Sequence, residues 1–307
     1  MSETEGAPAG FRCGYVALVG EPNVGKSTLM NRLLGQKISI VTRKPHTTRH
    51  KVLGILSNDR AQMIFLDTPG IITPHYALHE AMMRSAGAAI QDADVILLMI
   101  DASSPGSDDP ASHAQVFERL TGLTKPVHLV INKIDLIQKA ALLPVIDAFA
   151  KRYTFGEILP VSGLTGEGVE ELLRVMERGL PEHPPLYPPD IVSDHQERFF
   201  VAEIIREKIF IALQDELPYS TTVDIVEFKE RARGKWFISA DVYVERDSQK
   251  GIVIGKGGTK LREIGSAARR DIEAFLQNSV FLELHVKVRE GWRDQEEWLK
   301  RLGYGPS

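Results

Sequence analysis

The segment Gly20-Glu21-Pro22-Asn23-Val24-Gly25-Lys26-Ser27 constrains the fold of this 307-residue chain more than any other. It matches the pattern G-x-x-x-x-G-K-[S/T] and stands between an apolar run at 15–19 and a helix-like stretch at 27–34. In that context the glycines let backbone N–H groups approach phosphate oxygens, and the helix begins with its positive dipole end at the same place. The segment predicts a phosphate-binding loop. For this motif alone, a chance match in a glycine-containing turn is the alternative.

Apolar strand-like runs alternate with helix-like segments through the first 180 residues or so. This order predicts a mostly parallel sheet with helices on both faces, in which ligands bind beyond the carboxyl ends of the strands. Besides 15–19, the predicted strands are 52–56, 63–66, 95–100, 127–131 and 158–161. Besides 27–34, the predicted helices are 78–90, 111–120, 142–152 and 169–179.

A second motif, Asp67-Thr68-Pro69-Gly70, follows one of these strands. Asp67 is predicted to hold Mg²⁺ through water, and the Gly70 N–H to meet the γ-phosphate, while Lys26 reaches the β- and γ-phosphates and Ser27 ligates Mg²⁺. A threonine of Thr47-Thr48 is the candidate for completing the metal shell, and we favour Thr48. An ordinary pair of loop threonines explains these two residues equally well.

The third motif, Asn132-Lys133-Ile134-Asp135, predicts guanine recognition. We expect Asp135 to be a buried carboxylate that accepts two hydrogen bonds from guanine, which adenine cannot offer, so that ATP is rejected. Residues 162–164 are expected to close over the base, with the Gly163 N–H facing the guanine oxygen. The predicted nucleotide-binding residues are Gly20, Glu21, Pro22, Asn23, Val24, Gly25, Lys26, Ser27, Thr28, Asn132, Lys133, Asp135, Ser162, Gly163 and Leu164. The predicted catalytic residues are Lys26, Thr48, Asp67 and Gly70.

Two positions qualify this prediction. Ile71 directly follows Gly70, where Ras-like GTPases carry the glutamine that orients the attacking water, so we expect slow intrinsic turnover. Asn23 is a candidate for holding a monovalent cation, K⁺, at the phosphates. An asparagine in a tight turn more often caps its own backbone.

Composition limits the class of protein. Cys13 is the only cysteine, which excludes an intrachain disulfide and a cysteine-based zinc site. The N-terminus has no apolar core of a signal peptide, and the apolar runs have strand length, so we expect a soluble cytoplasmic protein. The net charge of −4 argues against a general nucleic-acid coat, but residues 250–270 hold six basic residues against one acidic residue. A solvated helix face is the alternative explanation for that stretch.

Five prolines within 181–190 predict a stiff, extended segment between two domains. The predicted organisation is a flexible N-terminus at 1–13, a GTP-binding domain at 14–180, a linker at 181–190 and a second domain at 191–307. In the second domain we expect a helix at 197–213, strands at 222–228 and 236–244, a helix–turn–helix at 252–276, and a strand at 280–288.

The turn at 255–258 resembles the Gly-x-x-Gly loop of KH domains, and the α-β-β-α-α-β order is that of the type II arrangement. Glycines there let an RNA strand approach the backbone, lysines meet phosphates, and apolar neighbours contact bases. A glycine-rich turn between helices is the alternative. The predicted RNA-binding residues are Ile254, Gly255, Lys256, Gly257, Gly258 and Lys260.

From residue 14 to residue 304 the chain resembles the Era family of bacterial GTPases, which carry a C-terminal KH domain. Departures from the family pattern are Gly163, where alanine is usual, and Ile71-Ile72. The resemblance covers both sides of the proline-rich segment and includes Gly35-Gln36-Lys37-Ile38-Ser39-Ile40, an effector stretch at 36–49, Arg206-Glu207-Lys208, Glu216-Leu217-Pro218-Tyr219-Ser220 and Leu302-Gly303-Tyr304.

The resemblance implies a P-loop GTPase domain followed by a small α+β type II KH domain. It further implies binding near the 3′ end of 16S ribosomal RNA, a role in assembly of the 30S subunit, and some peripheral association with the inner membrane. We expect GTP to order residues 36–49 and 70–84 and so to change RNA docking. Two alternatives are an RNA-modification partner, for which Cys13 is a poor nucleophile, and a metabolic P-loop ATPase, which Asp135 contradicts. A monomer is the default expectation.

Overall fold

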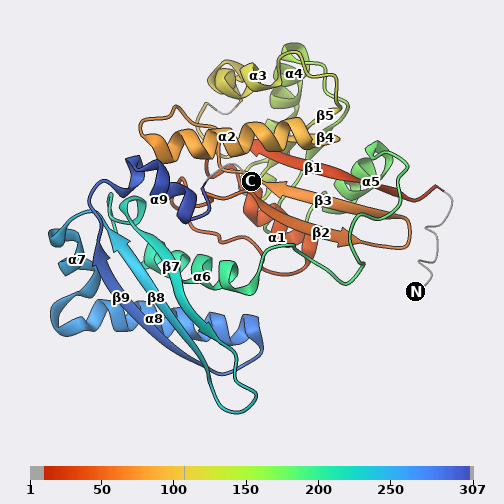
Figure 1. The fold of residues 1–307 in the computed structure, drawn as a ribbon. Coiled ribbons are helices and arrows are strands. Elements are labelled where there is room, and N and C mark those ends of the chain that lie inside the picture. The colour runs from red at the N-terminus through yellow and green to blue at the C-terminus, as the bar shows by residue number, and fades with distance from the viewer. Residues whose placement is uncertain (1–9, 107, 305–307) are drawn as a thin grey trace. The chain divides into compact units, whose positions relative to one another are not determined.

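The computed structural model describes residues 10–106 and 108–304, which form two compact units (Figure 1). The first unit comprises the residues up to Ser39, Thr48–Pro74 and Met82–Asp194. The second comprises Ile40–Thr47, His75–Ala81 and the residues from His195 onward. Most of the flexible N-terminus predicted at 1–13 lies outside the described residues, but Arg12 and Cys13 belong to the first strand rather than to a flexible segment.

The first unit is built on a six-stranded sheet in the order β2-β3-β1-β4-β5-β6. All neighbouring strands are parallel except β2 and β3, which confirms the predicted mostly parallel sheet. The strands are β1 (Arg12–Gly20), β2 (Val52–Ser57), β3 (Ala61–Asp67), β4 (Val95–Asp101), β5 (Val127–Asn132) and β6 (Ile158–Pro160).

The central strands are buried on both faces because helices cover each side of the sheet, as Figure 1 shows. Every residue of β4 is buried, which explains its continuous apolar sequence. The helices are α1 (Lys26–Leu34), α2 (Ala77–Asp92), α3 (Ala114–Leu120), α4 (Leu142–Arg152) and α5 (Val169–Gly179). The helix predicted at 111–120 begins instead as a 3₁₀ turn, Pro110–His113, where the Asp109 side chain caps the Ala111 N–H.

The proline-rich segment is attached to the first unit and does not form a free spacer. Gln62, fully buried in β3, accepts hydrogen bonds from the backbone N–H groups of Leu186 and Tyr187 at 2.8 and 2.9 Å. Its amide also donates to the Tyr187 carbonyl at 2.8 Å. Further on, the Ile55 N–H donates to the carbonyl of Val192, so this segment covers part of the edge strand β2. One buried glutamine thus supplies bonds that a proline-rich segment cannot make with itself.

We expect His128 to make the stability of the first unit depend on pH. The side chain is buried in β5, and neither ring nitrogen has a hydrogen-bond partner among the described residues. Burial lowers the pKa of His128 from 6.5, although the charge of Glu157 opposes the shift. Below pH 6.5 the unfolded state therefore binds more protons than the folded state, and the free energy of unfolding falls as pH falls, by at most about 1.4 kcal/mol per pH unit.

Urea unfolding between pH 7 and pH 5.5 checks this expectation. We expect His128→Phe to remove this component of the pH dependence, because phenylalanine does not titrate. His183→Phe, at an exposed position, is the matched control and should keep the parent profile. Identical profiles for His128→Phe and the parent protein would show that His128 is not the titrating group.

The second unit contains a three-stranded sheet in the order β7-β8-β9. The β7–β8 pair is antiparallel and the β8–β9 pair is parallel. Buried side chains of α6 and α8, such as Ile205 and Ile272, pack on one face of this sheet against Ile238 and Val242. The elements are α6 (Glu197–Ala212), β7 (Thr222–Lys229), β8 (Trp236–Val244), α7 (Asp247–Ile254), α8 (Thr259–Leu276), β9 (Val280–Val288) and α9 (Glu296–Arg301).

The α-β-β-α-α-β order predicted for this unit is present, with one boundary corrected. The first helix of the helix–turn–helix begins at Asp247 and not at residue 252. Gln249 starts it there, because its side-chain oxygen accepts the backbone N–H groups of Glu245 and Arg246. Polar residues fill this first turn, so the apolar pattern did not reveal it. Within the described part of the chain, no helix has the length and apolar content to cross a membrane.

Candidate functional sites

The predicted phosphate loop joins the end of β1 at Gly20 to the start of α1 at Lys26. Gly25 caps the helix with φ 95°, and a Cβ atom there would lie 2.3 Å from the Asn132 side-chain nitrogen. Only glycine fits this close approach. Asn23 has φ 64°, a left-handed conformation that asparagine tolerates better than most residues.

Lys26 points back over this loop. Its Nζ donates to the carbonyl oxygens of Gly20 at 3.0 Å and of Glu21 at 2.8 Å. Burial lowers the pKa of Lys26 from 10.5 to about 8, although the charges of Asp67 and Glu21 oppose the shift. An ammonium group is therefore held by the loop carbonyls at the N-terminus of α1.

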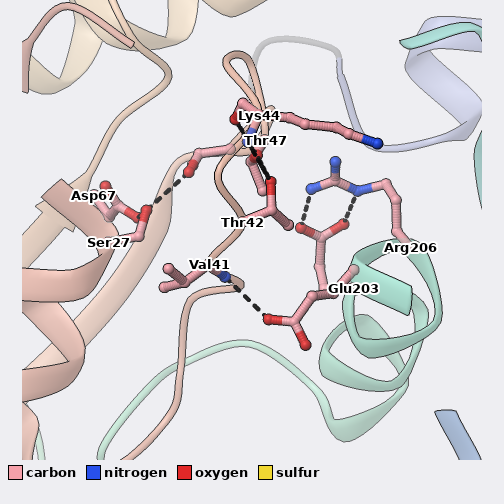
Figure 2. Close-up of polar contacts among 10 residues, drawn as sticks. Ser27, Val41, Thr42, Lys44, Thr47, Asp67, Glu203 and Arg206 are labelled. Carbon is pink, nitrogen blue, oxygen red and sulfur yellow. Dashed lines mark hydrogen bonds and ion pairs between the residues drawn. The ribbon is translucent and has the colours of Figure 1, made fainter. Parts of the chain in front are cut away.

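Ser27, Thr48 and Asp67 converge beside this lysine, from three different segments of the first unit. Ser27 Oγ donates to Asp67 Oδ2 at 2.6 Å, as Figure 2 shows, and lies 2.9 Å from Thr48 Oγ1. Asp67 is fully buried, and its Oδ1 has no hydrogen-bond partner among the described residues. Burial raises the pKa of Asp67, against the Ser27 hydrogen bond and the Lys26 charge. Two hydroxyls and a carboxylate with an uncommitted oxygen are a donor set that suits Mg²⁺.

Thr47 lies in the second unit and forms its hydrogen bonds there, with residues other than Ser27 and Asp67. Its Oγ1 donates to the Lys44 carbonyl at 2.8 Å and lies 2.6 Å from Thr42 Oγ1, as seen in Figure 2. The structure thus brings Thr48, and not Thr47, to Ser27. The predicted effector stretch at 36–49 contributes residues to both compact units.

The residues after Asp67 also lie at the phosphate loop. A Cβ atom at Gly70 would lie 2.6 Å from the Pro22 nitrogen, so a larger residue would displace the loop. The Ile71 N–H donates to the Gly20 carbonyl at 3.0 Å, and its side chain is buried. The side chain next to Gly70 is therefore apolar and directed into the protein, where it cannot orient a water molecule.

Asn132 connects the third predicted motif to the first. Its side-chain nitrogen donates to the Val24 carbonyl at 2.7 Å, and its oxygen accepts the Gly163 N–H at 2.9 Å. A Cβ atom at Gly163 would meet the Leu29 backbone at 3.2 Å, which explains why glycine is well suited there. Arg32 donates to the carbonyls of Gly163 and Leu164 and holds this closing loop, in which Ser162 is buried and Leu164 is exposed.

Lys133 and Asp135 occupy opposite environments. Lys133 Nζ donates to Asp101 Oδ2 at 2.5 Å. Burial raises the pKa of Asp101, but hydrogen bonds from Lys133 and Ser103 outweigh it and hold the pKa below its usual 3.8. Asp135 lies on the short turn Ile134–Leu136 and is exposed, which corrects the expectation of a buried carboxylate.

The predicted RNA-binding residues surround the turn between α7 and α8 in the second unit. Gly255, Gly257 and Gly258 have φ values of 71°, 60° and 75°. Lys256 is exposed and forms no side-chain bond within the described residues, whereas Lys260 pairs with Glu263 at 2.9 Å. The turn opens onto a groove of about 420 Å³ between α8 and β9, lined by Gly258, Leu261, Arg262, Gly265, Ser266, Arg269, Leu282 and Leu284.

Sequence reasoning missed several residues of both sites. Asp101 ends strand β4 beside the strand that leads to Lys133, and an acidic residue at a strand end was the available signal. Leu282 and Leu284 of the groove come from β9, which adjoins the turn only in the folded unit. Their alternating pattern was visible, but the sequence did not indicate which helix would face them.

Comparisons with known proteins match both halves of the chain. Residues 15–133 match the family model described as 50S ribosome-binding GTPase, and residues 216–293 match the KH domain model. GTPase Era of Geobacter metallireducens is 48% identical over 96% of this chain and 98% of its own. The chloroplastic GTPase ERA1 of Zea mays is 45% identical over 97% of this chain and 71% of its own.

Two solved structures are similar over nearly the whole chain. A variant of Aquifex aeolicus Era bound to GDP·AlF₄⁻ has a TM-score of 0.91 and 41% identity, covering 96% of this chain and 100% of that one. Era in complex with MgGDPNP and nucleotides 1506–1542 of 16S ribosomal RNA has a TM-score of 0.92 and 42% identity, with the same coverage. With identities above 40% across almost all of both chains, this chain belongs to the GTPase Era family.

Proposed function

We propose that this GTPase binds GTP with Mg²⁺ at the phosphate loop and uses the nucleotide to control binding of small-subunit ribosomal RNA. The proposed binding of GTP and Mg²⁺ rests on one observation. Ser27, Thr48 and buried Asp67 converge at the N-terminus of α1, next to the Lys26 ammonium, and one Asp67 oxygen is uncommitted. The GDP·AlF₄⁻ and MgGDPNP complexes of the two similar structures support this proposal.

In this proposal each residue has a separate task. Lys26 leaves the carbonyls of Gly20 and Glu21 to hold the β- and γ-phosphates, and the loop N–H groups surround the same oxygens. Ser27 and Thr48 hold Mg²⁺ directly, and Asp67 holds it through water. Bound Mg²⁺ neutralises charge on the phosphates during transfer. Because Ile71 cannot orient water, we expect slow turnover in the absence of a partner.

We further propose that the second unit binds RNA at the groove between α8 and β9, with the 3′ end of 16S ribosomal RNA as the target and 30S subunit assembly as the process. The groove has apolar residues from β9 on one side and Arg262 and Arg269 on the other. This combination suits unstacked bases and a phosphate backbone. The complex of Era with nucleotides 1506–1542 supports the choice of target.

Contacts within the second unit support control of the RNA site by the effector stretch. The Val41 N–H donates to Glu207 Oε1 of α6 at 3.0 Å (Figure 2), and Lys44 Nζ donates to the carbonyls of Phe210 and Leu213 at the end of α6. Burial lowers the pKa of Lys44, although Asp215 opposes the shift. Residues that GTP is expected to order thus contact a helix that supports the RNA-binding sheet.

The test is GTP turnover with and without an RNA oligonucleotide of the 16S 3′ end, with a scrambled oligonucleotide as control. We expect the 16S oligonucleotide to stimulate turnover and the scrambled one not to. We also expect RNA affinity to differ about fivefold or more between GDP and a non-hydrolysable GTP analogue, because coupled sites usually differ by about 1–3 kcal/mol in binding free energy. Equal RNA affinity in the presence of GDP and of a non-hydrolysable GTP analogue would contradict the coupling. Tight RNA binding without stimulation would leave the second unit as a tether only.

Four further parts of this proposal rest on the resemblance or on sequence alone. They are a K⁺ site at Asn23, action in the cytoplasm where 30S subunits assemble, a monomeric state, and peripheral association with the inner membrane. Comparing turnover in K⁺ and Na⁺ buffers tests the K⁺ site. Sedimentation tests the monomeric state, and flotation with anionic vesicles tests membrane association.

A further inference from the structure

The three-stranded sheet of the second unit has one face that no helix covers completely. Along β8, Ile238, Ala240 and Val242 point to α6 and α8, so Phe237, Ser239 and Asp241 point to the opposite face. On that face α9 covers one end, where Trp298 packs edge-on against Tyr243 with ring centroids 5.0 Å apart. The other end, beside the turn between β7 and β8, is open.

A pair of phenylalanines occupies this open end. Phe237 and Phe281 are direct partners in the parallel β8–β9 register, and their rings are nearly parallel, with centroids 6.0 Å and planes 15° apart. Phe281 lies on the edge strand β9 and is 51% exposed. An exposed aromatic pair at a sheet edge offers a flat apolar surface on which a nucleobase can stack.

Positive charge without internal partners lies next to this pair. The turn at 229–235 carries four basic residues against Glu230. One of them, Lys229, pairs in register with Phe237 and forms an ion pair with Glu227. Within the described residues, the side chains of Arg231, Arg233 and Lys235 are exposed and form no hydrogen bond or ion pair. Elsewhere on the face the basic side chains are paired, as in the ion pairs Lys287–Asp241, at 2.7 Å, and Arg301–Asp224, at 3.3 Å. The carboxylate of Glu283 also lies on this face, two residues from Phe281, and its Oε2 is 3.7 Å from His285 Nε2.

We infer that Phe281, Phe237 and the basic turn form a second contact surface for single-stranded RNA, separate from the groove between α8 and β9. Bases stack on Phe281, and phosphates are held by Arg231, Arg233 and Lys235. This inference rests on the RNA binding proposed above and extends it to longer RNA. A KH groove holds about four nucleotides, so further nucleotides need another surface.

Strand β9 connects the two surfaces. Leu282 lines the groove on the helix side of the sheet, and its neighbour Phe281 points to the opposite face. An RNA strand that leaves the groove reaches Phe281 by passing round the β9 edge. The turn itself offers only Ala232 and Gly234 between its charges, so it lacks the bulky apolar tip that insertion into a lipid surface requires.

The experiment measures binding of the full-length protein to two labelled RNAs of the 16S 3′ end, of about five and about fifteen nucleotides, by fluorescence anisotropy. We expect Phe281→Ala to weaken binding of the longer RNA about tenfold and to leave the shorter one unchanged. Val226→Ala, an exposed apolar residue of β7, is the matched control. We also test a triple variant, Arg231→Ala, Arg233→Ala, Lys235→Ala. For the longer RNA, the slope of log K against log salt concentration should become less steep by about 2, because three phosphate contacts are lost.

Each other outcome overturns the inference. If the variants bind the longer RNA as the parent protein does, or lose affinity equally for both RNAs, the proposed second surface does not exist. Loss of flotation with anionic vesicles in these variants, with RNA binding intact, would assign the face to a lipid surface. If the parent protein binds neither RNA, the proposed function fails first, and the two failures are thereby distinguished. The triple variant changes only exposed turn residues, so it keeps the test valid if Phe281→Ala fails to fold.

Discussion

Replacing Asp135 by asparagine is expected to convert this GTPase from GTP to xanthosine triphosphate. A carboxylate accepts two hydrogen bonds from the guanine N1 and N2 donors, whereas an asparagine amide presents one acceptor and one donor. Xanthine carries a carbonyl at position 2, which matches the amide. Asp135 is exposed, so we expect GTP affinity to fall about 10²- to 10³-fold, short of the 10⁴-fold or more of fully buried polar sites.

Direct binding of fluorescent GTP and of fluorescent xanthosine triphosphate to each protein measures this change. Asp147→Asn is the matched control, because Asp147 is an exposed carboxylate of α4 that pairs with Lys151. It should bind GTP as the parent protein does. A Asp135→Asn variant that still prefers GTP would refute the base-reading role and reopen the ATPase alternative.

The double substitution Gly257→Asp, Gly258→Asp is expected to abolish RNA binding without affecting the nucleotide site. Both glycines have left-handed backbone conformations, which aspartate adopts more readily than most residues, and a Cβ atom at either position meets nothing within 4 Å. The two carboxylates then repel the phosphates that Lys256 and Arg262 would otherwise attract. We expect RNA affinity to fall about a hundredfold or more, because such binding depends on neutralised phosphates.

The structure also decides which glycine to leave unchanged. A Cβ atom at Gly255 would lie 2.7 Å from the Lys260 Cβ, so substitution there strains the turn itself and confuses misfolding with lost binding. Gly122→Asp is the control, because it too has positive φ and open surroundings, in the first unit. In the double variant, RNA binding measured by filter retention should be lost, whereas GTP binding measured by fluorescence should be unchanged. A parallel loss of both activities would indicate misfolding instead.

The proline-rich segment shows where local reasoning was incomplete. Its composition correctly excluded a helix or a central strand, since prolines lack the N–H that either needs. Composition could not show that Gln62 binds this segment, because Gln62 and Leu186 are 124 residues apart in the chain. Gln62 stands one residue before the strand predicted at 63–66, so its place in β3, its burial and its partner were not evident.

The two loop threonines show a similar limit. Thr47 and Thr48 are adjacent and chemically identical, so no sequence pattern shows which of them lies beside Ser27. Tertiary contacts do separate them: Thr48 lies 2.9 Å from Ser27, and Thr47 is bonded within the turn at 42–47. In the same way, Lys133 was predicted as part of the base-reading motif, but its partner Asp101 follows from the order of β4 and β5 in the sheet.

The amino-acid sequence by itself determined the alternation of strands and helices, the three nucleotide motifs at strand ends, and the glycine turn of the second unit. These features depend on backbone conformations and polar groups that neighbouring residues specify. Only the tertiary structure decided which threonine joins Ser27 and Asp67, that Asp135 is exposed, and that β9 forms the second wall of the groove. Those features are contacts between segments distant in the chain, and they depend on strand order and packing, which no local pattern encodes.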